Sequence, residues 1–168
     1  IDFKDPETPV IERIDFDLSE HGHKLVIINT GGNHADLTGD YADITAECRM
    51  VANVFGKQFL RDVDVNEFYD NIALVRLKTN DRAVLRAIHF FNENNRATFE
   101  KDALLENRFD DFLKICKESG HSSFEYLQNV YSPSNPNEQG LSVALALAEK
   151  VLNGRGAFRV HGGGFAGT

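Results

Sequence analysis

The stretch Lys24-Leu25-Val26-Ile27-Ile28-Asn29 decides the fold class that the sequence predicts. Four apolar residues in a row, followed at once by Thr-Gly-Gly-Asn, are typical of a short strand that is buried on both faces. Just before it, apolar and acidic residues alternate over residues 14–18, which is the pattern of a half-buried antiparallel strand. Residues 156–160 form a third short candidate strand near the end of the chain. We therefore expect a sheet.

Between these strands the apolar residues change to the period of a helix. Asp40 and Asp64 are placed to cap two of the predicted helices, and Gly120 is placed to end another. Residues 140–148 are apolar on nearly all sides, so a last helix there, ended at Asn153, should be buried. Spacings of three and four residues predict the other helices over residues 41–55, 64–75, about 80 to beyond 91, and 105–120.

Together these elements predict an α+β fold, in which an antiparallel sheet packs against a layer of helices. The chain has 168 residues, which suits a single domain over residues 1–168. A cluster of glycines usually serves an element that follows it, yet here the cluster stands at the end of the sequence. We therefore expect the chain to be a piece of a longer protein.

Composition removes several classes of partner. Acidic residues number 26 against 18 basic ones, so the formal net charge is −8. Nucleic acids and anionic membranes attract basic surfaces, so we expect neither as a partner. No apolar run approaches the ~20 residues of a membrane span. Cys48 and Cys116 stand apart and are typical of small buried residues in a reducing compartment, which predicts the cytoplasm, although a disulfide between them stays an open alternative.

The segment Gly162-Gly163-Gly164-Phe165-Ala166-Gly167 satisfies the spacing G-x-G-x-x-G. A dinucleotide-binding fingerprint also needs a βαβ unit with an acidic residue ~20 positions later, and a P-loop needs Lys and then Ser or Thr after its last glycine. Neither follows here. Consecutive glycines let the backbone approach another body closely or adopt positive φ. A tight turn explains the same residues about equally well.

Two further groups of residues are candidates for a site. Tyr41 follows a polar, glycine-bearing loop, where ligand contacts tend to lie, and its hydroxyl suits a sugar. Spacing alone favours a packing role for its ring. His89, Glu93 and Arg96 lie at i, i+4 and i+7, on one face of a helix. They could belong to a site, but a polar contact between helices is the commoner explanation of such a stripe.

No complete catalytic or metal-binding set is visible in the sequence. His21 and His23, beside Glu20, lack the further ligands that zinc needs. No Ser-His-Asp order and no Gly-x-Ser-x-Gly elbow occurs. We therefore assign this chain no catalytic residue and no metal ligand.

Taken together, these segments resemble the C-terminal half of a galactokinase of the GHMP kinase superfamily. Residues 158–167 resemble that superfamily's third motif, a Gly-Gly-Gly-Phe-Gly-Gly type loop, with Ala166 in place of a glycine. The pattern Arg-Ala-x-His-x-x-x-Glu-x-x-Arg over residues 86–96 is similar to a stretch of galactokinases. The helix that starts near Tyr41, with Cys48 seven residues on, resembles the segment whose tyrosine hydrogen-bonds the sugar.

The resemblance implies transfer of the γ-phosphoryl group of ATP to the C1 hydroxyl of α-D-galactose, with Mg²⁺ as cofactor. It implies that Tyr41 orients galactose and that the backbone of Gly162, Gly163 and Gly164 lies near the phosphates. The family's other sugar-binding residues, its Ser-rich ATP loop and its catalytic Asp have no match here and would precede Ile1. We therefore expect the chain to be inactive alone, to bind neither ATP nor Mg²⁺ specifically, and to expose an apolar surface to the missing N-terminal half.

Three alternatives stay open. A galactokinase relative that binds galactose and ATP as a sensor, without phosphorylating, would share these motifs. Another sugar kinase of the superfamily would share most of them. An independent interaction domain with a turn-forming glycine run would leave the Tyr41 and 86–96 matches as coincidences. In each kinase-like case the most we expect of the stripe is contact with residues of the site and not with its ligands; this applies to His89, Glu93 and Arg96.

Overall fold

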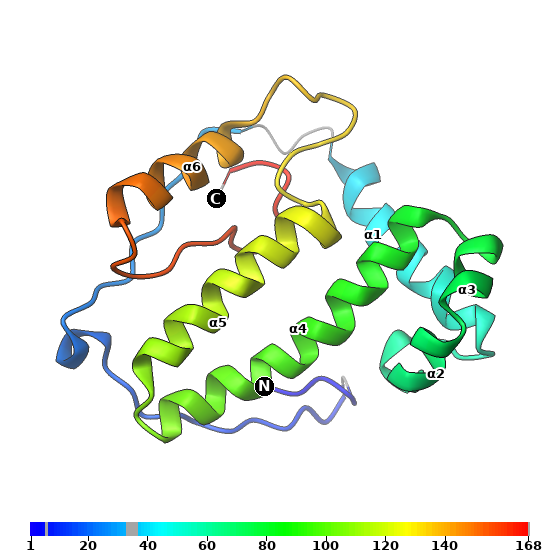
Figure 1. Cartoon of the computed structure of the whole chain (residues 1–168), viewed down its shortest axis with the longest axis horizontal. Helices are drawn as coiled ribbons and strands as arrows, with labels where there is room; N and C mark the ends of the chain where they lie inside the picture. Colours follow the sequence, from blue (N-terminus) through cyan, green and yellow to red (C-terminus); the bar gives the residue numbers. More distant parts are fainter. Residues whose placement is uncertain (6, 33–36, 168) are drawn as a thin grey trace.

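The computed structural model of the chain describes residues 1–5, 7–32 and 37–167. Helices make up 58% of the structure, and the described residues form no strand (Figure 1). The helices are α1 (Thr38–Val54), α2 (Val65–Asp70), α3 (Ile72–Lys78), α4 (Asp81–Leu105), α5 (Phe109–Ser122) and α6 (Gly140–Leu152), with short turns η1 (Leu18–His21), η2 (Leu60–Asp62) and η3 (Ser123–Leu127).

The expected α+β fold with an antiparallel sheet is therefore wrong. The one β-type pairing among the described residues is an isolated bridge between Asp2 and Val10. Residues 25–28, expected to form a buried strand, are 58–78% exposed. Residues 14–18 and 156–160 are not strands either. The physical reason is that a strand needs a neighbouring strand for its backbone N–H and C=O groups, and no described segment supplies one here.

The longest helix, α4, crosses the middle of the molecule, and α5 folds back beside it (Figure 1). α1, α2 and α3 cover one end of α4. α6 lies at the opposite end of the molecule, next to the C-terminal segment, and the N-terminal segment passes beside α4 (Figure 1). The chain thus has a helical end built from α1 to α4 and a second end built around α6.

Local sequence signals place most helix starts correctly. Asp64 and Asn80 each accept a hydrogen bond from the backbone N–H three residues further on, at 2.9 and 2.8 Å. The predicted helix over residues 64–75 is in fact two helices, because the chain breaks at Asn71, whose side chain donates back to the carbonyl of Glu67. Asp40 is not a cap, since α1 begins two residues before it.

Two expectations about the later helices are wrong. Gly120 does not end α5; a Cβ there would lie 3.0 Å from the carbonyl oxygen of Phe158, so this glycine permits close approach of the C-terminal segment. α6 ends at Asn153 as predicted, but Leu141 is its one buried residue. Apolar composition alone does not bury a helix; burial also needs a covering surface.

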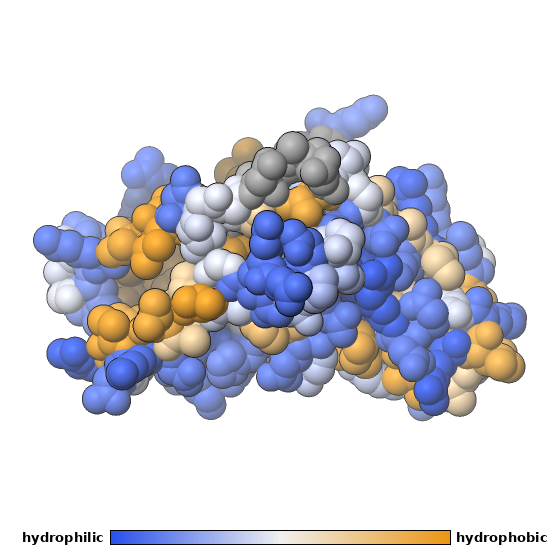
Figure 2. Space-filling model, turned by 90° about the horizontal axis from the view of Figure 1, so that it is seen from above, coloured by the Kyte–Doolittle hydropathy of each residue, from blue (hydrophilic) through white to orange (hydrophobic). Residues whose placement is uncertain are grey.

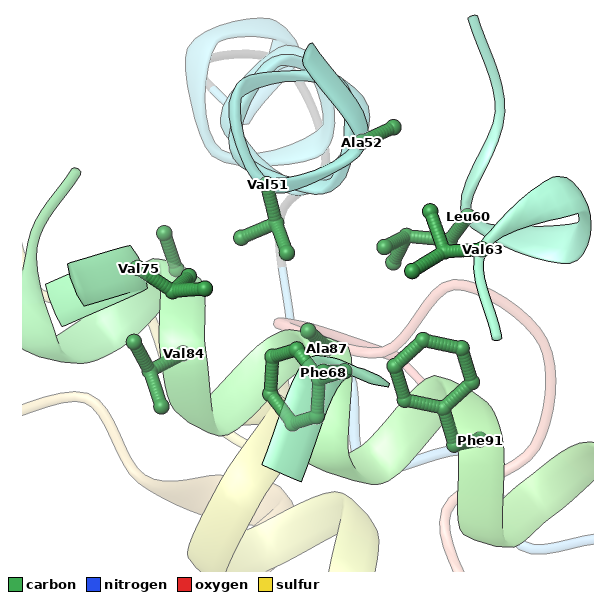
Figure 3. Close-up of a cluster of buried hydrophobic side chains, with 10 residues drawn as sticks. Val51, Ala52, Leu60, Val63, Phe68, Val75, Val84, Ala87 and Phe91 are labelled. Atoms are coloured by element: carbon green, nitrogen blue, oxygen red, sulfur yellow. The ribbon is translucent and has the colours of Figure 1, made fainter. Parts of the chain in front are cut away.

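The core of the helical end joins helices that are far apart in the sequence. Ten buried side chains pack together between α1, η2, α2, α3 and the first half of α4 (Figure 3). Phe68 and Phe91 lie at 5.1 Å between ring centroids in this cluster. The cluster fixes α1 on α4, and α1 carries the tyrosine singled out in the sequence. Its members are Val51, Ala52, Leu60, Val63, Phe68, Val75, Ala83, Val84, Ala87 and Phe91.

Candidate functional site

Tyr41 and the glycine run, 120 residues apart in sequence, lie against each other. The Tyr41 hydroxyl donates a hydrogen bond to the carbonyl oxygen of Gly164 at 2.9 Å. A Cβ on Gly163 would lie 2.5 Å from Cε1 of the Tyr41 ring, so only glycine fits beneath the ring. The structure therefore brings together two of the candidate groups that the sequence singled out.

The glycine loop has a backbone that ordinary residues avoid. Gly162 and Gly164 have φ of +67° and +77°, and Phe165 has a φ of +62°. Gly162 and Gly163 are exposed, whereas Gly164 and Phe165 are buried. No hydrogen bond within the described residues uses the N–H groups of Gly162, Gly163 or Gly164. A turn of this kind offers N–H groups to an anion, as backbone nests do.

Asn129, which the sequence analysis did not single out, holds the loop from below. Its side-chain Nδ2 donates to the carbonyl oxygen of Gly163 at 3.1 Å. Its backbone carbonyl accepts a hydrogen bond from the N–H of Phe165 at 2.5 Å. A Cβ on Gly164 would lie 2.0 Å from that same carbonyl oxygen, so a side chain at this position is excluded.

A polar contact joins the start of α1 to the loop that precedes α6. The Asp40 carboxylate accepts a hydrogen bond from Ser132 at 2.5 Å, and Ser132 in turn contacts Ser134 at 2.6 Å. Ser132 is buried. Asp40 therefore acts as an anchor for this loop, a role different from the helix cap that the sequence predicts.

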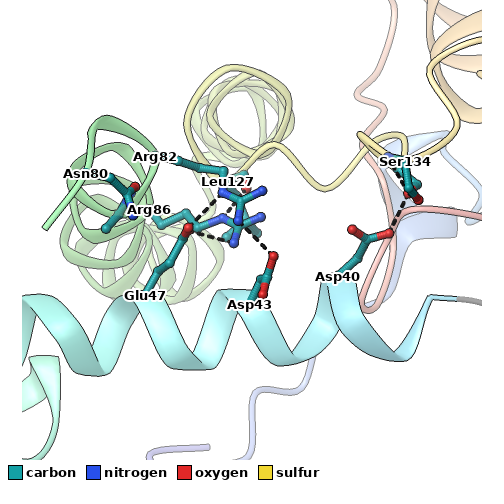
Figure 4. A network of polar contacts seen from close by, with 10 residues as sticks. Asp40, Asp43, Glu47, Asn80, Arg82, Arg86, Leu127 and Ser134 are labelled. Atoms are coloured by element: carbon teal, nitrogen blue, oxygen red, sulfur yellow. Dashed lines mark hydrogen bonds and ion pairs between the residues drawn. The ribbon is translucent and has the colours of Figure 1, made fainter.

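A charge network around the buried side chains of Glu47 and Arg86 joins α1, α4 and η3 (Figure 4). Glu47 accepts hydrogen bonds from Arg82 and Arg86, both at 2.8 Å, and Arg82 also contacts Asp43 at 2.8 Å. Arg86 donates to the carbonyl oxygen of Leu127 at 3.1 Å. Burial lowers the pKa of the Arg86 guanidinium, and the neighbouring Glu47 charge opposes that shift. Tyr41 on α1 and Asn129 just after η3 are thus carried by one platform.

Comparison with known proteins gives this arrangement a context. The chain is 30% identical over 147 residues to "Galactokinase" of Actinobacillus pleuropneumoniae serotype 5b (strain L20), covering 88% of this chain and 36% of the relative. The chain is a relative of the galactokinases. Galactokinases of Glaesserella parasuis serovar 5 (strain SH0165) and Haemophilus influenzae (strain ATCC 51907 / DSM 11121 / KW20 / Rd) are 30% and 29% identical, over 87% and 85% of this chain. No family model matches the chain.

The chain spans about a third of the length of the galactokinases that it matches, 36% of the Glaesserella protein and 35% of the Haemophilus protein. The matched region covers most of this chain. The geometry described above therefore corresponds to about a third of a galactokinase of the kind that the chain matches.

The third candidate group of this galactokinase relative lies apart from the Tyr41 contact. His89 is buried, and its Nδ1 lies 2.9 Å from the hydroxyl of Ser122 on α5. Glu93 accepts hydrogen bonds from Ser119, from Arg96 at 2.8 Å and from Arg159 at 3.2 Å. The stripe thus forms the polar contact between helices that its spacing favoured. Through Arg159 it also holds the segment that leads into the glycine loop.

The charges of this stripe are set by burial and by its partners. Burial lowers the pKa of His89, although the Glu93 charge opposes the shift. For Glu93 burial alone would raise the pKa, but the hydrogen bonds from Ser119 and Arg96 and the charge of Arg159 outweigh it, and the pKa is lowered. His89 is therefore neutral and Glu93 ionised near neutral pH.

The cysteines and His21 lie in environments that the structure describes directly. Cys48 and Cys116 are free thiols, and burial raises their pKa values to about 11 and about 12, which disfavours the reactive thiolate form. His21 stacks on the ring of Phe16 at 4.7 Å.

In the part of the chain that is described, no three His, Cys, Asp or Glu side chains are gathered as a metal site. None of its described helices is both long and apolar enough to cross a membrane.

The residues that sequence analysis missed differ in how far the sequence signals them. Asn129 reaches the loop because Gln128 has a φ of +58° after η3, and no pattern in the sequence announces that turn. The charge network did leave a signal. Asp40, Asp43 and Glu47 are spaced three and four apart on α1, and Arg82 and Arg86 are spaced four apart on α4. Complementary stripes of this kind could have predicted the pairing of the two helices.

Proposed function

We propose that this chain is the C-terminal portion of a galactokinase, which transfers the γ-phosphoryl group of ATP to the C1 hydroxyl of α-D-galactose. The support is the similarity to proteins named galactokinase over 88% of the chain, together with the contact between Tyr41 and the glycine loop. We place the reaction in the cytoplasm, where thiols such as Cys48 and Cys116 stay reduced.

The contact between Tyr41 and the glycine loop is the observation that carries this proposal. Phosphoryl transfer is catalysed mainly by positioning, so groups that hold the sugar and groups that hold the phosphates have to be neighbours. In our proposal Tyr41 orients galactose, and the N–H groups of Gly162 and Gly163 face the phosphate oxygens of ATP. Both glycines are exposed, and their N–H groups donate no hydrogen bond within the described residues. A loop without side chains lets phosphates approach these groups closely.

The same inventory leads us to propose that the chain alone does not phosphorylate galactose. Kinases hold Mg²⁺ through carboxylates and phosphate oxygens and use a further group to orient the attacking hydroxyl. The described residues gather no cluster of three acidic, His or Cys side chains, and we assign Mg²⁺ no ligand among them. Neither Tyr41 nor the glycine loop supplies charge to a transferring phosphoryl group.

An exposed apolar surface supports the proposal that further polypeptide covers this chain. Val143, Leu147 and Val151 on α6 are 57–70% exposed, and residues 25–28 are 58–78% exposed. These two groups are neighbours: a Cβ built on Gly140, at the start of α6, would lie 3.5 Å from Cβ of Thr30, two residues after the exposed run 25–28. Apolar side chains gather at this end of the molecule in Figure 2. Large contiguous apolar patches usually mark interfaces, and in our proposal the rest of a galactokinase covers this one.

The test is to express the complete gene product that contains this sequence and to measure ATP-dependent phosphorylation of galactose beside related sugars. The 168-residue chain is assayed in parallel. We expect turnover of galactose by the complete protein and none by the chain. Turnover by the chain alone would contradict the assignment of the missing groups to other polypeptide. A folded complete protein that binds galactose and ATP without turnover would favour the sensor, and binding of neither would leave an interaction domain.

A matched pair of variants tests the role of Tyr41 in the complete protein. Tyr41→Phe removes only the hydroxyl, and we expect at least a tenfold lower kcat/KM for galactose, because a site built around a hydrogen bond discriminates strongly when that bond is lost. Tyr69→Phe, at a half-exposed tyrosine on α2, serves as the control and should leave kcat/KM unchanged. Equal behaviour of the two variants would contradict the proposed role.

A further inference from the structure

Asn129 occupies a place that the chain reaches only through an unusual turn. α5 runs on into η3, and Gln128 then adopts a left-handed backbone with a φ of +58°. The N–H groups of Gln128 and Asn129 both point back to the carbonyl oxygen of Ser123, at 2.8 and 3.5 Å. Ser123 and Asn129 are 1% and 2% exposed. The turn therefore presents Asn129 to the underside of the glycine loop in a fixed orientation.

Asn129 contacts the loop on both sides of Gly164. Its side-chain amide holds the carbonyl of Gly163 at 3.1 Å, and its backbone carbonyl holds the N–H of Phe165. From above, the Tyr41 hydroxyl holds the carbonyl of Gly164 itself at 2.9 Å. Two consecutive peptide groups, 163/164 and 164/165, are thus fixed. The second leads into the left-handed Phe165, a conformation that residues with a side chain rarely adopt without such support.

If the Asn129 side chain only filled space, its buried and unpaired polar atom would be unfavourable. Its Oδ1 is buried, and within the described part of the chain it has no hydrogen-bond partner. Turning the amide over would place that oxygen against the carbonyl oxygen of Gly163, so the observed orientation is the favourable one. An apolar side chain of similar size would avoid an unpaired buried oxygen. The donor Nδ2 is therefore the part of the side chain that explains its presence.

We infer that Asn129 is a positioning residue, which fixes the glycine loop so that the N–H groups of Gly162 and Gly163 are held ready for phosphate oxygens. This inference rests on the proposed function of the loop. Asn129 is buried beneath the loop and acts through it, so it touches neither the sugar nor the nucleotide. Its removal should therefore affect the use of ATP more than the use of galactose.

Asn129→Leu in the complete gene product separates positioning from packing. Leu fills the space without the unpaired oxygen, so the midpoint of thermal unfolding should stay the same or rise. The loop loses its donor to Gly163, so we expect KM for ATP to rise at least tenfold, with KM for galactose within twofold of the original. Asn129→Asp keeps the shape but turns an acceptor toward the Gly163 carbonyl, and its effect on ATP should be at least as large. Asn137→Ala, in the exposed loop before α6, is the control.

Amide hydrogen exchange tests the inference even if the protein does not phosphorylate galactose. In Asn129→Leu the backbone carbonyl that accepts from the Phe165 N–H remains, but the loop loses its hydrogen bond at Gly163. A less firmly held loop should let the Phe165 N–H exchange at least tenfold faster, while amides in α4 keep their rates. Unchanged exchange at Phe165 would overturn the inference whatever the activity. Faster exchange with unchanged KM for ATP would also overturn it, because the loop would then be fixed without serving the nucleotide. Absence of kinase activity in the original protein would count against the proposed function alone.

Discussion

The two ends of this molecule use similar apolar side chains in opposite ways. At the helical end, ten apolar residues of α1, η2, α2, α3 and α4 are buried against one another (Figure 3). At the other end, α6 shares a small buried cluster with Val130 and Val160 through Leu141, while Val143, Leu147 and Val151 on the same helix are 57–70% exposed. The difference shows that the composition of a segment determines how much apolar surface it carries, whereas the packing of neighbouring elements determines how much of that surface is buried.

Truncating one large apolar residue at each end is the strongest test of this contrast. Phe68 is 0% exposed in the core and Leu147 is 57% exposed on α6. Phe68→Ala should lower the free energy of unfolding by about 3–5 kcal/mol through lost burial and a cavity, whereas Leu147→Ala should change it by less than about 0.5 kcal/mol. Urea unfolding followed by circular dichroism measures both. Comparable losses from the two variants would mean that α6 is already covered.

The charge network makes a second prediction about the helical end. In Glu47→Gln the Arg86 guanidinium, whose side chain is 1% exposed, keeps its charge but loses its carboxylate partner. We expect the free energy of unfolding to fall by about 3 kcal/mol, because an unpaired buried charge is costly. The exposed pair of Arg13 and Asp15 is the matched control, and Asp15→Asn should cause no measurable loss. A small effect of Glu47→Gln would show that water reaches Arg86.

The contrast between the ends also explains what the sequence could predict of the fold. The cap at Asp64, the start of a helix near residue 80 and the end of α6 at Asn153 depend on a few neighbouring residues, and each was predicted correctly. The strand over residues 24–29 and the burial of α6 depend on partners elsewhere in the chain or beyond it. A local apolar pattern cannot report whether those partners are present, and both predictions were wrong.

The candidate site shows the same division. Tyr41 and the glycine loop were singled out by residue type and by resemblance, and the structure places them in contact. Their proposed roles toward sugar and phosphate stay predictions. Asn129 was not found, because its approach depends on a left-handed Gln128 and a π-turn that leave no periodic signal. Spacing along one helix predicted the shared face of His89 and Glu93, but it could not identify Arg159 as the partner of Glu93.

The buried polar contact around His89 and Glu93 should contribute less to the free energy of unfolding as the pH falls. His89 has a pKa below its ordinary value of 6.5 and Glu93 one below its ordinary value of 4.5, so both bind protons more readily when unfolded. Their contribution is therefore present above those ordinary values and is lost as the pH falls below them, first for His89 and then for Glu93.

Unfolding measured from about pH 7 to about pH 5 isolates the His89 part of this dependence. The free energy of unfolding should decline toward pH 5, and His89→Gln should flatten that decline. His121→Gln, at an exposed histidine of α5, provides the comparison and should leave the decline as it was. A decline that persists fully in His89→Gln would assign the pH dependence to other groups.

Replacing exposed apolar residues of α6 should change stability least, but it tests directly whether this surface drives association. Val143→Gln with Leu147→Gln replaces two exposed apolar side chains, so the free energy of unfolding should change by less than about 0.5 kcal/mol per site. Self-association of the isolated chain, measured by sedimentation velocity, should nevertheless decrease, because an uncovered apolar patch drives association. Leu77→Gln on α3 is the matched control: Leu77 is 83% exposed but belongs to the well-packed end. If Leu77→Gln reduces association as much as the α6 variant does, exposure anywhere on the chain is sufficient, and the contrast between the two ends does not hold.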